Sequence, residues 1–308
     1  MNILSVTKTD FRAMFPAPLH AYNDVAHAAL NAHKVERTRY LLFVDEGKTR
    51  FGIILGERNG RLLSPFSAPF GGFVQHRPQS LRAMEEAVTA LKRYAAELSL
   101  GVEITLPPLV YDVAELSKWV NVLSRRAAMA TADVNYHYAL RLFPRYVETL
   151  ERRARNKLAQ AMSNDFTFIT VDSRDSAGAM RAYDVIRRNR AEHSYPLRMT
   201  YDEVTATSRV VPTDFFLLCH DGRDVAAAQV FHVADGVVQV IYWGDIGECS
   251  HLRTMNMLAF RIFEHYHNAG IRIVDTGTAS TDGKPNHGLC EFKESIGCTA
   301  TNKFSFIF

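Results

Sequence analysis

The sequence predicts an α+β (α/β) fold of two tandem domains, each a mixed, mostly antiparallel sheet flanked by helices. A chain of 308 residues is long enough to form two hydrophobic cores. Residues 236–279 read as strand, loop, helix and strand, which is a βαβ unit with parallel neighbouring strands. The order of elements in the second half also follows that of the first half. We therefore predict domains at residues 1–144 and 145–308, with the boundary at Phe143-Pro144.

The first half is expected to combine a hairpin with two long helices. Glu46-Gly47-Lys48 favours a turn between two β-rich runs, and Ser80 is a good helix N-cap, with Gly101 beyond the helix end. The elements expected here are a helix over 18–34, strands over 40–45 and 51–55, a helix over 81–98, a strand over 102–106, a helix over 113–128 and a strand over 134–142.

The second half is expected to contain an antiparallel meander followed by the βαβ unit. Its strongest turn signals are residues 220–223 and 234–236, which both contain Asp-Gly, and Thr200 with Glu203 forms a capping box. Gly270 is placed to end the helix of the βαβ unit. The expected elements are helices over 146–162 and 176–193, a short helix after Thr200, a helix over 252–266, and strands over 166–171, 215–219, 225–233, 237–243, 271–275 and 304–308.

Composition excludes several classes of protein. Hydrophobic residues make up 47% and charged residues 22%, which is typical of a soluble globular protein, and a net charge of +3 is too small to indicate nucleic-acid binding by itself. The four cysteines lack CxxC spacing and are interpreted as reduced thiols. The histidines lack metal-site spacing, so no metal is expected. No apolar run is long enough for a signal peptide or a membrane span, so a cytoplasmic protein is expected.

Six short segments together carry a resemblance to a known family. They are SPFSAPFGG (64–72), ERRARNKLAQA (151–161), IRRNRAEHSYP (186–196), IYWGD (241–245), IVDTGTAS (273–280) and GLCEFKESIG (288–297). By their order and spacing, the chain resembles the Fem-type family of tandem N-acetyltransferase-like (GNAT) aminoacyl- and acyltransferases, known from peptidoglycan bridge synthesis. The resemblance covers most of the chain. It implies two GNAT-like domains and a transferase that acylates an amine, with cell-envelope or polysaccharide precursors among the acceptors.

The resemblance also suggests catalytic residues. The family has a Phe-Lys pair whose lysine lies at the transfer site, and the matching residue is Lys293, which would stabilise the oxyanion unless it is a surface lysine. Tyr242 ends the strand that holds the donor carbonyl in GNAT-like domains, where it would protonate the leaving group or else pack within the sheet. Asp275 ends a parallel strand and is either a general base or a residue that fixes the next loop.

A cluster of cationic and aromatic residues suggests where the acceptor binds. Arginine holds carboxylates and phosphates bidentately, so Arg190 with Tyr195 and His193 is expected to bind an anionic acceptor, although part of this cluster faces solvent. Phe292 is expected to form a wall of the site or part of the core.

The apolar loop of the first half is a second substrate-binding candidate. Ser64, Gly71 and Gly72 lie in a segment with two prolines and two glycines, which cannot be regular structure throughout. It is either a substrate-side loop, where glycine lets backbone approach a ligand, or a loop that merely closes the domain.

The donor is left open by the loop that follows residue 243. Trp243, Gly244 and Gly247 are the candidate donor-binding residues, but the loop lacks the full coenzyme A pyrophosphate pattern, and Asp245 and Glu248 would repel phosphates. No bound cofactor is expected, and the co-substrate is acyl-CoA or aminoacyl-tRNA. The basic face of the predicted helix over 146–162 would contact tRNA phosphates or would simply be solvated; it carries Arg152, Arg153, Arg155 and Lys157.

N-acyl transfer by direct attack of a bound amine on a thioester or aminoacyl ester is the leading hypothesis. The first alternative is a catalytically inactive GNAT-like protein that binds its ligand without transfer. The second is binding of tRNA or another nucleic acid alone, which the small net charge disfavours.

Overall fold

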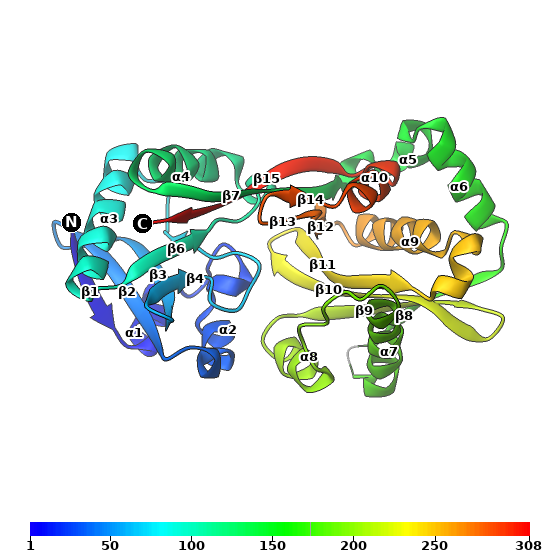
Figure 1. Ribbon diagram of the computed structural model, residues 1–308, viewed down its shortest axis with the longest axis horizontal. Coiled ribbons are helices and arrows are strands. Elements are labelled where there is room, and N and C mark those ends of the chain that lie inside the picture. The colour runs from blue at the N-terminus through cyan, green and yellow to red at the C-terminus, as the bar shows by residue number, and fades with distance from the viewer. Residues whose placement is uncertain (173) are drawn as a thin grey trace. The chain divides into compact units, whose positions relative to one another are not determined.

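A computed structural model describes residues 1–172 and 174–308 of the chain, which form two compact units (Figure 1). The first unit contains Met1–Val134, Ser280–Pro285 and Thr301–Phe308, and the second contains Asn135–Ala279 and Asn286–Ala300. These bounds differ from the predicted division between residues 144 and 145. The last strand belongs to the first unit because it pairs antiparallel with a strand of that unit, Ser305 opposite Thr105.

The first unit is built on a sheet with the strand order β1-β2-β3-β4-β6-β15, in which β4 and β6 are parallel. Helices α3 and α4 bury their apolar faces in the same core as these strands, with Leu91 and Trp119 among the buried residues. The strands are β1 Asn2–Val6, β2 Arg37–Asp45, β3 Lys48–Arg58, β4 Arg61–Ser64, β5 Phe73–Val74 beside β3, β6 Gly101–Thr105 and β15 Thr299–Ile307. The helices are α1 Lys8–Met14, α2 Val25–Leu30, α3 Leu81–Glu97 and α4 Val113–Arg126.

The long helix predicted over 18–34 is wrong. The structure divides it into the 3-10 turn Ala21–Asn23, helix α2 and the 3-10 turn Ala32–Lys34. Asp24 adopts an extended backbone and accepts a hydrogen bond from the amide of Ala26, so it caps a new helix where the prediction continued one. The alanine-rich composition favours helix but does not show this capping residue.

The second unit is built on a sheet with the strand order β7-β12-β11-β10-β9-β8. Helix α9 lies on one face of this sheet, and α7 and α8 lie on the other (Figure 1). The strands are β7 Ala128–Ala139, which begins in the first unit, β8 Phe166–Val171, β9 Thr213–His220, β10 Arg223–Ala234, β11 Val237–Asp245 and β12 Ile273–Thr278. The helices are α5 Tyr146–Thr149, α6 Arg152–Met162, α7 Ser176–Glu192, α8 Tyr201–Ser208, α9 Thr254–Asn268 and α10 His287–Ser295.

Local signals in the second unit are confirmed with one exception. The capping box of Thr200 and Glu203 is present, and Asp221 and Gly222 both adopt positive φ in the turn between β9 and β10. The predicted helix over 146–162 is instead two helices, because Leu150 takes an extended conformation between α5 and α6.

A β-bulge in β11 decides which side chains face which helices. Gln229 of β10 pairs with Tyr242, but Val230 pairs with Val240, so Ile241 is an extra residue in β11. The bulge shifts the alternation of side chains. Tyr242 therefore packs in the core beneath α7, and Trp243 points to the opposite face, where its ring centroid lies 5.9 Å from that of Phe292 on α10.

Candidate functional site

The parallel strands β11 and β12 diverge at the centre of the second unit. They share three residue pairs, ending at Gln239 opposite Asp275. Beyond this point β11 continues along β10 to Asp245, and β12 continues along β7 until Thr278. On its β12 side, the backbone of residues 240–244 has no strand partner within the described part of the chain. Backbone N–H and C=O groups that no strand uses can bond a ligand.

Lys293 fixes the divergent end of β12. Its side chain is 2% exposed, and its ammonium donates to three successive carbonyl oxygens, of Thr276 at 2.7 Å, Gly277 at 2.8 Å and Thr278 at 3.0 Å. Burial lowers the pKa of Lys293 to about 8. The alternative of a surface lysine is therefore wrong. The predicted donation to an oxyanion stays a prediction, and it requires one carbonyl to be released, because an ammonium has only three N–H groups.

Asp275 is fully buried and ties three strands together. One carboxylate oxygen accepts from the amide nitrogen of Asn135 on β7 at 2.8 Å and from the Gly277 backbone at 2.9 Å. The other accepts from Gln239 on β11 at 2.7 Å. The carboxylate therefore holds the point from which β11 and β12 diverge, and a role as general base stays a prediction.

Four of the predicted residues come together on the α7 side of β11. The Arg190 guanidinium lies 5.3 Å from the ring centroid of Tyr242 and 5.8 Å from that of Tyr195, and the ring of His193 stacks on Tyr195 at 5.5 Å. Such cation–π contacts are favourable when the cation is partly desolvated.

Arg190 is a cation without an acidic partner. It forms no ion pair with any residue in 1–172 or 174–308, and its buried Nε lacks a hydrogen-bond acceptor. Burial lowers its pKa. A half-buried guanidinium with unused N–H groups is suited to a planar anion such as a carboxylate, or to a phosphate.

Tyr242 keeps its hydroxyl proton near neutral pH because burial raises its pKa. The hydroxyl oxygen accepts from the backbone amide of Arg198 at 3.2 Å, which leaves its own proton free to be donated.

Three residues were not singled out from the sequence. Tyr136 of β7 donates to the carboxylate of Glu294 on α10 at 2.7 Å, and the Lys293 ammonium lies 5.8 Å from the ring centroid of Tyr136. Gln229, opposite Tyr242, is fully buried, and neither its oxygen nor its nitrogen has a partner among the described residues. Glu294 belongs to the GLCEFKESIG segment, whereas no local pattern marks the other two.

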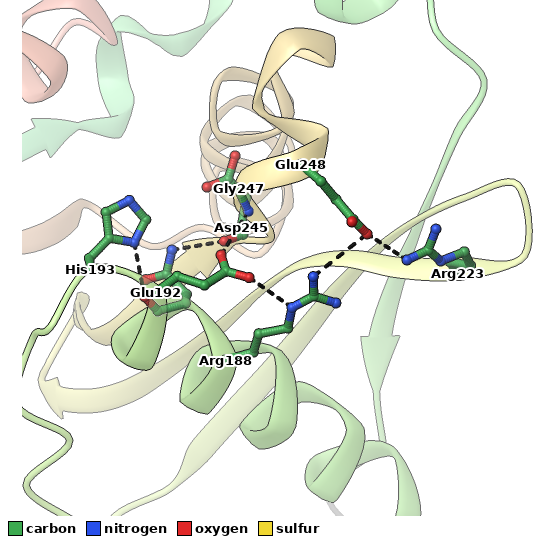
Figure 2. Close-up of polar contacts among 8 residues, drawn as sticks. Arg188, Glu192, His193, Arg223, Asp245, Gly247 and Glu248 are labelled. Atoms are coloured by element: carbon green, nitrogen blue, oxygen red, sulfur yellow. Dashed lines mark hydrogen bonds and ion pairs between the residues drawn. The ribbon is translucent and has the colours of Figure 1, made fainter.

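The loop expected to bind the donor is occupied by carboxylates of the chain itself (Figure 2). The backbone amide of Gly247 donates to Glu192 of α7 at 2.9 Å, and Arg188 holds the other oxygen of Glu192 at 2.8 Å. The hydrogen bond from Gly247, reinforced by Arg188, lowers the pKa of Glu192. Glu248 accepts from Arg223 at 2.6 Å. The Gly247 amide, which the sequence predicts to bind the donor, is therefore already bonded to Glu192.

Gly244 serves packing inside the second unit. A Cβ at this position would clash with the side chain of Asn189, whose amide nitrogen donates to the carbonyl of Asp245 at 2.8 Å. Gly244 thus lets α7 approach β11 closely, which is a different use from the predicted contact with a donor.

The apolar loop of the first unit is held by internal hydrogen bonds. Ser64 Oγ accepts from the Gly72 amide at 3.0 Å, and Asn23 donates to the Gly72 carbonyl at 3.3 Å. A Cβ on Gly71 would lie 2.7 Å from Ser64 Oγ. The close approach that requires glycine at residue 71 is therefore to the chain itself, and binding of a substrate by this loop stays a prediction.

Neither a metal cluster nor a membrane-spanning helix occurs in the described part of the chain. Within residues 1–172 and 174–308, no group of three His, Cys, Asp or Glu side chains is arranged to hold a metal ion. None of the helices described is both long and apolar enough to cross a membrane.

The fold is that of tandem GNAT-like proteins, as predicted, and it is similar to the fold of a Fem-type protein. The structure is similar to that of FemX, with a TM-score of 0.68 and 11% identity over 100% of this chain and 98% of that chain. It is also similar to a C-terminal domain named for a lysylphosphatidylglycerol synthetase from Agrobacterium fabrum, with a TM-score of 0.60 and 13% identity over 97% and 89% of the two chains. A tandem GNAT protein from the clavulanic acid biosynthesis pathway matches with a TM-score of 0.50 and 10% identity over 100% and 98%.

No protein-family model and no curated protein sequence matches the chain. At identities of 10–13%, these structural similarities show a shared fold and not a shared activity.

Proposed function

We propose that the second unit transfers an aminoacyl group from an ester donor to an amine acceptor. The observation that carries this proposal is the divergence of β11 from β12, which leaves residues 240–244 of β11 without a strand partner on that side, where their backbone amides would hold an acyl carbonyl. The names of the structural neighbours, FemX and a lysylphosphatidylglycerol synthetase domain, agree with this class of reaction.

The chemistry requires charge stabilisation and a proton transfer. The amine nitrogen attacks the ester carbonyl, the carbon–nitrogen bond forms, and negative charge develops on the carbonyl oxygen. Backbone amides of β11 stabilise that charge, together with the Lys293 ammonium once it has released one of its three carbonyls. The carbon–oxygen bond then breaks, and the leaving oxygen takes a proton from Tyr242, which recovers one from the attacking nitrogen.

An aminoacyl-tRNA ester is the donor in this proposal, and acyl-CoA is the alternative. Coenzyme A diphosphate would need amides of the loop after β11, but Gly247 already donates to Glu192, and the Glu248 carboxylate lies in the same loop. Two further negative charges brought there would be repelled. An aminoacyl ester needs no diphosphate site. Because charged tRNA is found in the cytoplasm, the proposed reaction takes place there.

The acceptor in this proposal carries an anionic group beside its amine. The Arg190 guanidinium, between Tyr195 and Tyr242, would hold a carboxylate or phosphate of the acceptor close to the Tyr242 hydroxyl. Cell-envelope and polysaccharide precursors contain both groups.

The test is a transfer assay with defined donors. Purified protein is incubated with tRNA charged with labelled alanine, serine or lysine in turn, or with labelled acetyl-CoA, and with a nucleotide-linked cell-wall peptide as acceptor. We expect a new amide, detected by mass spectrometry, from a charged tRNA, and a rate reduced about 100-fold in Tyr242→Phe. Formation of product from acetyl-CoA alone would contradict the proposed donor, and no product from any donor would contradict the activity.

A catalytically inactive ligand-binding protein is the second candidate. It is favoured by one observation, that all three N–H groups of Lys293 are occupied by carbonyls. It predicts saturable binding of the acceptor peptide in calorimetry with no loss of labelled donor over time.

A further inference from the structure

The positive charge of the chain is concentrated at helix α6. Residues 141–162 contain six Lys or Arg and two Asp or Glu, so this segment has a formal charge of +4, whereas the whole chain has +3. The remaining residues are therefore slightly acidic in sum. The small net charge of the whole chain is therefore compatible with a strongly basic surface at this segment.

The four cations of α6 are exposed and unpaired. Ala154, Leu158 and Ala161 face the core, and the outward part of the helix carries no acidic residue. Among the residues that the structure describes, no carboxylate pairs with any member of the α6 surface, which comprises Arg152, Arg153, Arg155 and Lys157.

The placement of these charges opposes the stability of the helix. Arg152 and Arg153 stand in the first turn, where the helix dipole disfavours cations, and no acidic residue is present in that turn. Arg152 with Arg155, and Arg153 with Lys157, are like charges one helical turn apart, which also disfavours the helix. A bound polyanion would remove both penalties, so the charge pattern fits a partner rather than a solvated helix.

The α6 surface is connected to the proposed transfer site within the second unit. Helix α6 packs against α9 within that unit (Figure 1). Gln160 at its C-terminal end donates to the carbonyl of His251 at 3.2 Å and accepts from Arg253 Nε at 3.0 Å. His251 belongs to the 3-10 turn Gly247–Leu252, which follows β11, so α6 contacts the segment that connects to the strand expected to hold the acyl carbonyl.

We propose that the α6 surface binds the phosphate backbone of the RNA that carries the donor ester. This inference rests on the proposed function, because it assigns a surface to the donor of that reaction. An RNA fits better than a lipid bilayer because the outward face of α6 presents cations with Asn156 and Ala159 between them, and Met162, its one large apolar residue that is exposed, lies at the end.

The test measures RNA binding as a function of salt. A fluorescent, uncharged tRNA is titrated with wild-type protein, with Arg152→Gln/Arg155→Gln and with Arg153→Gln/Lys157→Gln at several KCl concentrations. We expect each double variant to bind roughly tenfold more weakly and the slope of log affinity against log salt to fall by about 2, because each of the two missing cations no longer neutralises a phosphate. The matched control is Arg58→Gln/Arg93→Gln, which changes net charge equally at exposed positions of the first unit and should bind as wild type.

Each outcome decides between the inference and the function on which it rests. An equal loss of RNA affinity in the control and in the α6 variants would mean that only the net charge of the protein matters, and it would overturn the inference. Transfer from charged tRNA with unchanged RNA binding in the α6 variants would also overturn it while leaving the proposed function intact. RNA binding that depends on α6, with no transfer from any donor, would support the inference and contradict the function. Binding of phosphatidylglycerol vesicles through α6, without RNA binding, would overturn RNA as the partner.

Discussion

Lys293 and Gly277 together determine how β12 ends. Gly277 adopts a φ of +78°, a conformation that side-chain-bearing residues rarely take, and its carbonyl is the middle one of three that converge on the Lys293 ammonium. An ordinary strand points successive carbonyls in opposite directions. The positive φ and the register shift between Asp275 and Gly277 allow the convergence, and the lysine donates to all three carbonyls.

Replacing Lys293 by methionine should destabilise the protein by about 3 kcal/mol or more, because one buried and two partly buried carbonyls would lose their donor. Equilibrium urea unfolding measures this. The control is Lys284→Met, an exposed position expected to change the free energy of unfolding by less than about 0.5 kcal/mol. Equal urea midpoints for the two variants would show that the carbonyl contacts contribute little.

Gly277→Ala should lower the free energy of unfolding by about 1–2 kcal/mol, because alanine is disfavoured in the backbone conformation of this residue. Space is not the limit, since the nearest atom to an added Cβ is the Val240 carbonyl oxygen at 3.9 Å. Gly288→Ala is the matched comparison. Its position is helical and its added Cβ would meet nothing closer than 3.8 Å, so we expect a gain of about 0.5–1 kcal/mol. Thermal unfolding should show a lower midpoint temperature for Gly277→Ala and a higher one for Gly288→Ala. Equal shifts of the two midpoints would contradict this prediction.

Arg190→Ala should raise the KM for the acceptor about tenfold or more and leave kcat nearly unchanged, because Arg190 is assigned to binding. The control is Arg187→Ala, since Arg187 lies on the same helix, is exposed and pairs with Asp184 at 3.0 Å. Initial rates over a range of acceptor concentrations separate the two constants. A fall in kcat with unchanged KM would place Arg190 in the chemical step instead.

Removing the carboxylates at the loop after β11 should admit a diphosphate. We expect no saturable binding of coenzyme A to the wild type in calorimetry and measurable binding to Glu192→Ala/Glu248→Ala, because the Gly247 amide is then free. The variant Glu46→Ala/Glu97→Ala makes the same change in net charge at exposed positions and should not bind. Tight binding by the wild type would show that these carboxylates do not block the loop.

An ion pair on the α9 side of the sheet should make stability depend on pH. The hydrogen bond from His232 to Asp214, at 2.7 Å, raises the pKa of His232. For Asp214, burial opposes ionisation, but the hydrogen bonds from His232 and Tyr266 together lower its pKa. His265 also interacts with this carboxylate, and burial lowers its pKa. A raised histidine pKa means that the folded state binds the proton more tightly than the unfolded state does.

The stabilisation by His232 should therefore be complete below about pH 6, which is below the unfolded pKa of histidine, and disappear as pH rises through its folded pKa. The free energy of unfolding should differ between wild type and His232→Gln more at about pH 5.5 than at about pH 8.5. Asp214 stays ionised over this range. His232 also lowers the pKa of His265, so the comparison is repeated in a His265→Gln background, where only His232 titrates beside Asp214. A constant difference across the range would mean that the ion pair contributes nothing.

The sequence by itself determined the elements whose signals are local. Hairpin turns such as Asp221-Gly222, the capping box at Thr200 and the βαβ order of residues 236–279 were predicted and are present, because each depends on backbone preferences and periodicity within a few residues. The tandem fold followed from the order of these elements. Even so, Asp24 and Leu150 interrupt predicted helices, since one capping or extended residue is enough to end a helix that composition favours.

The tertiary structure alone decided what surrounds the site. The bulge at Ile241 arises from pairing with β10, and it alone places Tyr242 beside Arg190 and Trp243 beside Phe292. Lysine is normally a surface residue, so the burial of Lys293 depends on three carbonyls from a strand earlier in the chain. The occupation of the Gly247 amide likewise depends on Glu192, 55 residues away in the sequence. These contacts join residues far apart in the chain, and local periodicity contains no information about them.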